Sequence, residues 1–159
     1  MNDILDEILE SAFSTADTHA DRMQSAFTKL SPFYPFQADF FDPLLDEHLL
    51  IVELFIGRFA KLQDFMGTKL FDLVLEATKE YADKLTFIDK LNLLEKRSII
   101  DDAHIWDKLR KTRNDLAHEY PDKPQLMADN LNKAFLLAPV LLKTLENCHA
   151  TVERARKYR

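Results

Sequence analysis

Glycine is almost absent from this chain, and that scarcity limits the folds open to it. Only two of the 159 residues are glycine, Gly57 and Gly67, and six are proline. All-β and α/β folds need frequent turns, which these two residue types supply more than any others. Leucine, alanine, lysine and acidic residues dominate instead, and most of them suit helix. We therefore predict an all-α protein: an up-and-down helical bundle of about five helices, in a single domain spanning residues 1–159.

Apolar residues recur at helical spacing, and prolines mark where the helices stop. Asp42 followed by Pro43 predicts a helix start, with a side-chain cap and then proline in the first turn. Asp101 or Asp102 can cap the helix that Pro121 should end, and Pro139 should kink or split the last one. The second helix is the most apolar, so we expect it to be the central, most buried one. The predicted helices cover about 2–30, 43–66, 69–81, 86–100 (one or two short helices), 101–119 and the segment from 124 onward.

Charge and cysteine content narrow the cellular setting. The formal net charge of −6 gives no bulk attraction to nucleic acid, so any RNA contact must come from a local basic patch. Cys148 is the only cysteine, which excludes an internal disulfide and suits a reducing cytosol. The first residues lack the basic region of a signal peptide, and the apolar runs are too short to span a bilayer. We expect a soluble, cytoplasmic protein that does not enter a membrane.

Common catalytic and metal-binding motifs are missing from the sequence. It contains no CxxC pair, no HExxH and no glycine-rich phosphate loop. The five histidines show no metal-ligand spacing with one another. We therefore expect no metal site and no cofactor. The candidate chemistry falls on residues 109–121, which read as the last turns of a helix leading into a proline stop.

This stretch has two distinct faces at a helical step of about 100° per residue. One narrow stripe should face the core and consists of Ile105, Leu109, Thr112 and Leu116. A second, polar row lies on the far side and consists of Arg110, Asn114 and His118. The helix is thus amphipathic, and its outward face carries the side chains that can do chemistry.

Arg113 lies between these two faces and has no acidic residue at i±3 or i±4. Such a guanidinium is available to hold a phosphate with two parallel hydrogen bonds. An ion pair with Glu53 or Asp64 of the second helix is the competing interpretation. His118 lies roughly 140° further round the helix, so the two side chains cannot meet from one straight helix. The long reach of arginine, unwinding of the helix before Pro121, or a second copy of the helix would close that gap. Two copies packed antiparallel across a twofold axis would bring both pairs into one cleft.

The residues from Arg113 to Tyr120 resemble a known signature. The pattern Arg113-Asn114-x-x-x-His118-x-Tyr120 is similar to the Arg-x(4–6)-His signature of the HEPN superfamily, in the Arg-x4-His-x-Tyr form of HepT-type toxins. The chain length, the all-helical pattern and the position of the motif before the last helix also resemble that family. Such proteins are homodimeric, metal-independent ribonucleases, commonly paired with a minimal nucleotidyltransferase (MNT) antitoxin that neutralises them.

The resemblance implies an active site at the dimer interface, with Arg113 and His118 as catalytic residues and Asn114 in support. Histidine has the pKa for acid–base work at a 2′-hydroxyl or a leaving 5′-oxygen, and arginine stabilises charge on the phosphoryl oxygens. Tyr120 matches the tyrosine that the antitoxin can modify by AMPylation. The expected function is therefore that of an endoribonuclease toxin acting on RNA.

Each of these residues also has a plainer interpretation. His118 could simply interact with the negative end of the helix dipole, and Tyr120 could cover the edge of the core. Lys108, Arg110 and Lys111 form a basic patch for RNA, and each taken singly equally fits a solvated helix face. At the level of function, the alternative is a non-catalytic HEPN subunit that docks a nucleotidyltransferase. A plain dimeric helical scaffold is the third option.

Overall fold

A computed structural model describes residues 3–80, 82–118 and 120–158, and this part of the chain consists of helices joined by turns and loops, without strands. The predicted all-α bundle is confirmed. Short 3₁₀ helices at Ser31–Phe33, Ala38–Phe41 and Ala82–Lys84 lie in the connections. The main elements are α1 (Asp3–Leu30), α2 (Asp46–Phe65), a π-helical turn (Met66–Leu70), α3 (Phe71–Ala77), α4 (Phe87–Lys96), α5 (Ala103–Leu116) and α6 (Pro124–Lys157).

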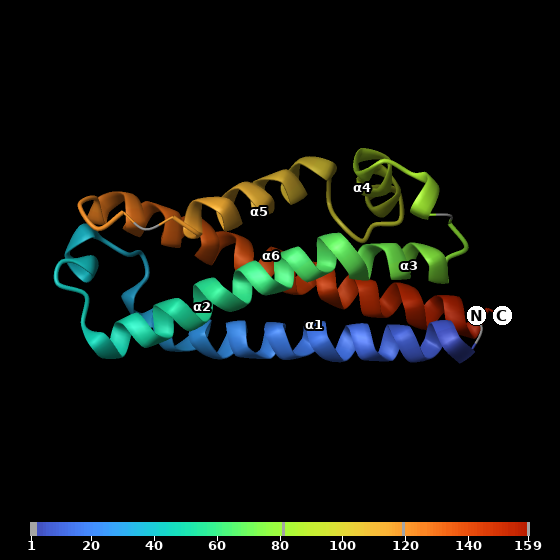
Figure 1. The fold of residues 1–159 in the computed structure, drawn as a ribbon, viewed down its shortest axis with the longest axis horizontal. Coiled ribbons are helices and arrows are strands. Elements are labelled where there is room, and N and C mark those ends of the chain that lie inside the picture. Colours follow the sequence, from blue (N-terminus) through green and yellow to red (C-terminus); the bar gives the residue numbers. More distant parts are fainter. Residues whose placement is uncertain (1–2, 81, 119, 159) are drawn as a thin grey trace.

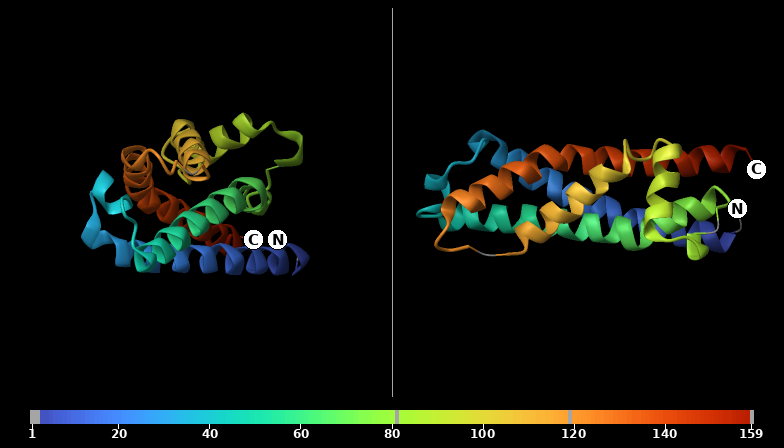
Figure 2. Two further views of the ribbon diagram at one scale, coloured as in Figure 1. Left: turned by 60° about the vertical axis from the view of Figure 1, so that its left-hand side comes forward. Right: turned by 90° about the horizontal axis from the view of Figure 1, so that it is seen from above.

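Three long helical rods form the body of the bundle (Figure 1). Helix α2 continues through the π-helical turn into α3, and this rod lies along α1 on one side and α6 on another. Helices α4 and α5 lie across the top of the α2–α3 rod, and α5 also packs on α6. The start of α1, the end of α3 and the end of α6 are gathered at one end of the molecule (Figures 1 and 2).

The core follows directly from helical periodicity. Aromatic side chains with no exposed surface, such as Phe55, Phe59 and Trp106, fill its centre. Fully burying one such side chain contributes about 1.5–3 kcal/mol relative to leaving it exposed. Helix α1 shows the pattern most simply, with buried residues at successive turns: Leu9, Ala12, Phe13, Ala16, Ala20, Met23, Ala26 and Leu30.

The prediction that the second helix is the most buried one is wrong, because α6 buries more of its residues than α2 does. Twelve residues of α6 are buried, against five of α2. Helix α2 leaves Leu50 69% exposed and Leu54 37% exposed. Helices α1, α5 and α6 all pack against α2, but they leave the side of the helix that carries these two leucines open to solvent.

Two predicted helix boundaries are corrected by the structure. Asp42 does not cap α2, because the helix begins at Asp46 with Leu45 as an extended N-cap residue. Helix α5 ends at Leu116, before the predicted end at Glu119, which itself lies outside the described residues. The start of α5 is as predicted, since the Asp102 carboxylate accepts a hydrogen bond of 2.9 Å from the backbone N–H of Ile105.

Pro139 bends α6 but does not divide it. The helix runs without interruption from Pro124 to Lys157, so a split at this proline is ruled out. Figure 2 shows the helix changing direction part-way along its length. Proline has no N–H to donate, which leaves the carbonyl of Phe135 without its usual helical partner. Packing on both sides of the proline is sufficient to keep the two halves in one helix.

The aromatic loop between α1 and α2 is fastened to α6 by one asparagine. The backbone N–H of Phe36 donates to Asn132 Oδ1 at 2.7 Å, and Asn132 Nδ2 donates to the Phe36 carbonyl at 2.9 Å. The Phe36 ring is 1% exposed and meets the Phe135 ring edge-on, with the centroids 5.1 Å apart. The loop is thus part of the core at this end of the bundle.

Candidate functional site

Helix α5 presents the two faces that its sequence predicts. Leu109, Thr112 and Leu116 are buried, and Ile105 is half-buried. The opposite side of the helix is exposed at Arg110 and Asn114. Trp106, which the predicted stripe omits, is fully buried and packs against Phe71 with the ring centroids 4.6 Å apart. Trp106 therefore anchors α5 to the α2–α3 rod.

Arg113 has a partner, and the partner is Asp64 of α2. Arg113 Nε lies 3.1 and 3.2 Å from the two carboxylate oxygens, and Arg113 Nη2 lies 2.8 Å from Oδ2. The hydrogen bond that Arg113 donates to Asp64 raises the pKa of Arg113, while desolvation opposes that rise and the Coulombic attraction of Asp64 adds to it. In the single chain Arg113 is therefore paired with an acidic residue of α2, and the competing ion-pair interpretation is confirmed, with Asp64 as the partner.

A cavity of about 680 Å³ opens beside this ion pair, between α2, the π-helical turn, α4 and α5. Arg110, Arg113 and Asn114 line it from α5. The Arg110 guanidinium lies 5.2 Å from the centre of the Phe87 ring on α4, a cation–π distance. Three of the predicted site residues therefore share one cavity: Arg110 and Asn114 of the polar row, and Arg113 beside them.

The floor of this cavity contains the π-helical turn. Gly67 in this turn lies against the indole of Trp106, where an added Cβ would be 3.4 Å from the ring. The Thr68 hydroxyl donates to the Asp64 carbonyl at 2.7 Å. The Trp106 Nε1–H also borders the cavity, is buried, and has no hydrogen-bond partner in the described part of the chain. π-helical turns within α-helices occur frequently at functional sites.

His118 and Tyr120 lie outside the cavity, on the loop that follows α5. His118 is exposed, and its backbone N–H donates to the Asp115 carbonyl at 3.3 Å. The His118 and Tyr120 rings are tilted to each other with centroids 6.1 Å apart. The structure therefore places Arg113 and Asn114 at one position and His118 with Tyr120 at a neighbouring one. This separation is the one that helix geometry predicts for a single copy of the chain.

Lys108 and Lys111, the remaining residues of the predicted RNA-binding patch, are exposed on α5. They are not among the described residues that line the cavity. Sequence reasoning missed Phe87 and Lys90, which line the cavity from α4. Nothing in the local pattern of α4 marks either of them, because their role depends on how α4 packs across α5.

Metal and thiol chemistry find little support in the described residues. No group of three histidine, cysteine, aspartate or glutamate side chains there is placed to hold a metal ion. Cys148 is buried in α6, and burial raises the pKa of its thiol to about 12. The thiol is therefore protonated near neutral pH and is a poor nucleophile. In the same part of the chain, no helix combines the length and apolar character needed to cross a bilayer.

Comparisons of the chain with models of protein families, with curated proteins and with solved structures give no match. The resemblance to the HEPN superfamily therefore rests on the sequence alone, chiefly on the pattern from Arg113 to Tyr120.

Proposed function

We propose that this chain is a metal-independent endoribonuclease of the HEPN type, the toxin of a HEPN/MNT toxin–antitoxin pair in the cytoplasm. One observation carries the proposal. Arg113 and Asn114 line an open cavity at the last turns of α5, and the exposed His118 follows immediately on the same segment. An RNA strand can therefore reach all three residues without any rearrangement of the core.

The proposed reaction is an internal transfer within the RNA strand. The 2′-hydroxyl attacks the adjacent phosphate, the bond to the 5′-oxygen breaks, and a 2′,3′-cyclic phosphate and a free 5′-hydroxyl result. His118 takes the proton from the 2′-hydroxyl or gives one to the leaving oxygen. Arg113 stabilises the negative charge that builds on the phosphoryl oxygens.

Asp64 competes with the RNA for Arg113. Its side chain is 48% exposed and that of Arg113 is 30% exposed, so solvent weakens their attraction. A phosphate can offer the same guanidinium two oxygens at similar geometry. Binding of RNA would then exchange one anionic partner for another, at the cost of separating a half-exposed ion pair.

The separation of His118 from the Arg113 cavity supports a composite site formed by two copies. In a homodimer, Arg113 of one chain would face His118 of its partner across a twofold axis. An MNT-type nucleotidyltransferase would neutralise the toxin by adding a nucleotide to Tyr120. A bulky anion two residues from His118 would block the site and repel RNA.

Cleavage of RNA in the presence of EDTA tests the proposal. His118→Ala and Arg113→Ala should lower the rate by about 100-fold or more. The matched controls are His104→Ala, at an exposed histidine of α5, and Arg22→Ala on α1; both should cut at the wild-type rate. Circular dichroism of every variant checks that the helices remain. Wild-type rates in both active-site variants, or loss of activity in EDTA, would overturn the proposal.

A mixing experiment tests the composite site separately. A heterodimer of the His118→Ala and Arg113→Ala chains keeps one site with both residues if that site spans two chains. Mixing two inactive proteins should then restore part of the activity. A site contained within one chain would leave the mixture inactive.

The Arg113–Asp64 pair specifically favours a second candidate, a non-catalytic subunit that docks a nucleotidyltransferase. A permanent pair would serve only to hold α5 on α2. This candidate predicts a stable complex with the nucleotidyltransferase, harmless expression of the chain, and no RNA cleavage by either the wild-type protein or an Asp64→Asn variant.

A further inference from the structure

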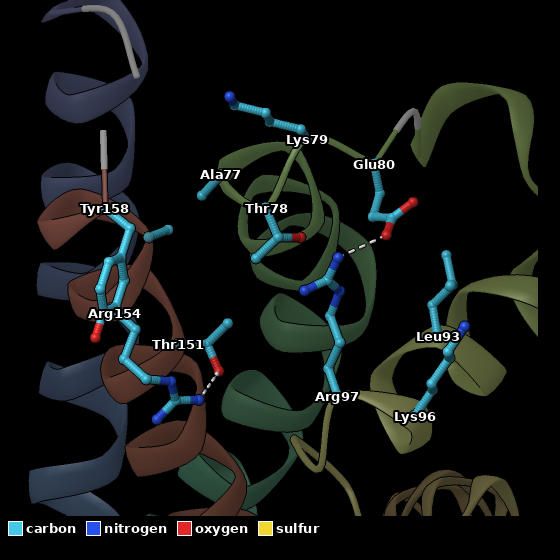
Figure 3. A pocket seen from close by; sticks show the side chains of 11 residues that line it. Ala77, Thr78, Lys79, Glu80, Leu93, Lys96, Arg97, Thr151, Arg154 and Tyr158 are labelled. Carbon is cyan, nitrogen blue, oxygen red and sulfur yellow. Dashed lines mark hydrogen bonds and ion pairs between the residues drawn. The ribbon is translucent and has the colours of Figure 1, made fainter.

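A second cavity, of about 680 Å³, lies at the opposite end of α5 from His118, where α3, α4 and α6 end (Figure 3). It shares no lining residue with the cavity beside Arg113. Its walls come from three separate segments: 77–80 after α3, the last turn of α4 around Arg97, and the last turns of α6 around Arg154. The packing of α3, α4 and α6 together therefore creates it, and no single helix does.

The described lining of this cavity is strongly cationic. Lys79, Lys96, Arg97 and Arg154 contribute four positive charges, and Glu80 is the one acidic residue among them. Arg97 Nη2 pairs with Glu80 Oε1 at 2.6 Å. A local excess of positive charge in a chain with a formal net charge of −6 is not a consequence of composition.

Helix dipoles explain only part of this excess. Each of the three helices turns its negative C-terminal end toward the cavity, and cations are stabilising there. However, backbone donors already satisfy several of the terminal carbonyls. Lys79 and Glu80 donate to carbonyls of α3, and Arg97 donates to Leu93 in α4. The cations therefore still have the capacity to bind an external anion.

The side chains also provide polar and aromatic surfaces. The Arg154 Nη2 donates to the Thr151 hydroxyl at 3.3 Å, which holds the guanidinium at the cavity wall. Tyr158 lies beside Arg154 in Figure 3 and is 87% exposed. Figure 3 places Arg97 between α3 and Leu93 of α4, so basic groups lie on two facing sides of the cavity. An aromatic ring in the same cavity as the two arginines, Arg97 and Arg154, suits a ligand that is aromatic at one end and anionic at the other.

We propose that this cavity binds a nucleoside polyphosphate. Arg97, Arg154 and Lys96 would hold the phosphates, and the Tyr158 ring would stack on the base. The cavity volume lies within the range of small-molecule sites, which favours a single nucleotide over a polymer strand. This site is independent of the proposed ribonuclease activity, because it shares no residue with the α5 segment.

Isothermal titration of the full-length protein with ATP, tripolyphosphate and adenosine tests the proposal. ATP should bind best, tripolyphosphate more weakly, and adenosine least. The double variant Lys96→Gln/Arg154→Gln should weaken ATP binding by about tenfold or more. Arg22→Gln on α1 and Lys133→Gln on α6 change exposed cations elsewhere and should leave the affinity unchanged.

Tyr158→Ala tests the contact with the base separately from the contacts with the phosphates. It should weaken the binding of ATP and leave the binding of tripolyphosphate unaltered. Equal ATP affinity in the wild type and the double variant would overturn the proposal. So would a protein that ignores ATP and binds a short single-stranded RNA through the same two cations, since the surface would then be an RNA contact.

Discussion

Arg113 of α5 holds both carboxylate oxygens of Asp64 on α2, through three hydrogen bonds of 2.8–3.2 Å. The two residues are 49 positions apart in sequence, so the pair joins one end of the polar helix to the body of the bundle. While the pair is formed, the Arg113 guanidinium is not free to bind a phosphate. The state of this one ion pair therefore links the stability of the protein to its proposed activity.

Asp64→Asn should release Arg113 and raise the affinity for RNA. The same change should lower the free energy of unfolding by about 1 kcal/mol or less, because the pair is half-exposed. Fluorescence anisotropy with labelled RNA measures the first effect, and urea denaturation measures the second. Asp46→Asn, at the exposed start of α2, makes the same charge change without touching Arg113. Equal RNA affinity in the two variants would contradict the link.

Asn132→Ala should loosen the aromatic loop from α6. It removes both hydrogen bonds to the Phe36 backbone, which leaves a part-buried donor and acceptor unpaired. We expect the free energy of unfolding to fall by about 1–3 kcal/mol. Chemical denaturation gives the number, and Asn92→Ala on the exposed side of α4 serves as the control, with a change within about 0.5 kcal/mol. A cost as small as that of the control would mean that the aromatic rings alone hold the loop.

His19 should make the protein less stable as the pH falls. Its ring Nδ1 lies 2.9 Å from Arg58 Nη1, and the pKa is lowered from 6.5 by burial, then by the charges of Arg58 and Lys61. The unfolded chain therefore takes up the proton first. The contribution of neutral His19 to the free energy of unfolding is fully present above a pH of 6.5. It is lost as the pH falls through the lower pKa that His19 has in the folded state.

The variant His19→Asn tests this dependence because asparagine does not titrate. Its free energy of unfolding should fall less than that of the wild type between neutral pH and about pH 5.5. His104→Asn, at an exposed position of α5, should keep the wild-type profile. Parallel profiles for wild type and His19→Asn would assign the acid sensitivity to other groups.

Gly57→Ala should stabilise the protein. An added Cβ at this position in α2 meets no atom within 4 Å, so the gain in helix propensity carries no steric penalty. We expect the free energy of unfolding to rise by about 0.5–1 kcal/mol. Gly67→Ala should gain less, because its Cβ would lie 3.4 Å from the indole of Trp106. Thermal and urea unfolding compare the two, and equal gains would show that the indole contact costs nothing.

Local periodicity explains what the sequence predicts correctly. The inward stripe of α5 and the cap at Asp102 depend only on neighbouring residues, and both are confirmed. The partner of Arg113 depends on the register in which α2 packs along α5, so the sequence alone could not decide between Glu53 and Asp64. Residues such as Phe87 join the site only through the packing of α4 across α5.

The wrong boundaries have equally specific causes. Asp42 and Pro43 are good start residues, but the chain passes from a 3₁₀ helix to an extended Leu45 before α2 begins. The acidic pair Asp46 and Glu47, at the positive end of the helix dipole, is the better signal. At Pro139, where a kink or a split is predicted, the helix bends without dividing, because residues on both sides of the proline are buried.

The π-helical turn at Met66–Leu70 has a consequence for chain length. Such a turn holds one residue more than the α-helical path between the same points. Removing a single residue there would let the backbone close into ordinary α-helix, with α2 and α3 still turned toward the core. Elsewhere in the rod, the same deletion would rotate everything beyond it by about 100°. This turn is therefore the one position in the rod where the protein can shorten without turning its interior outward.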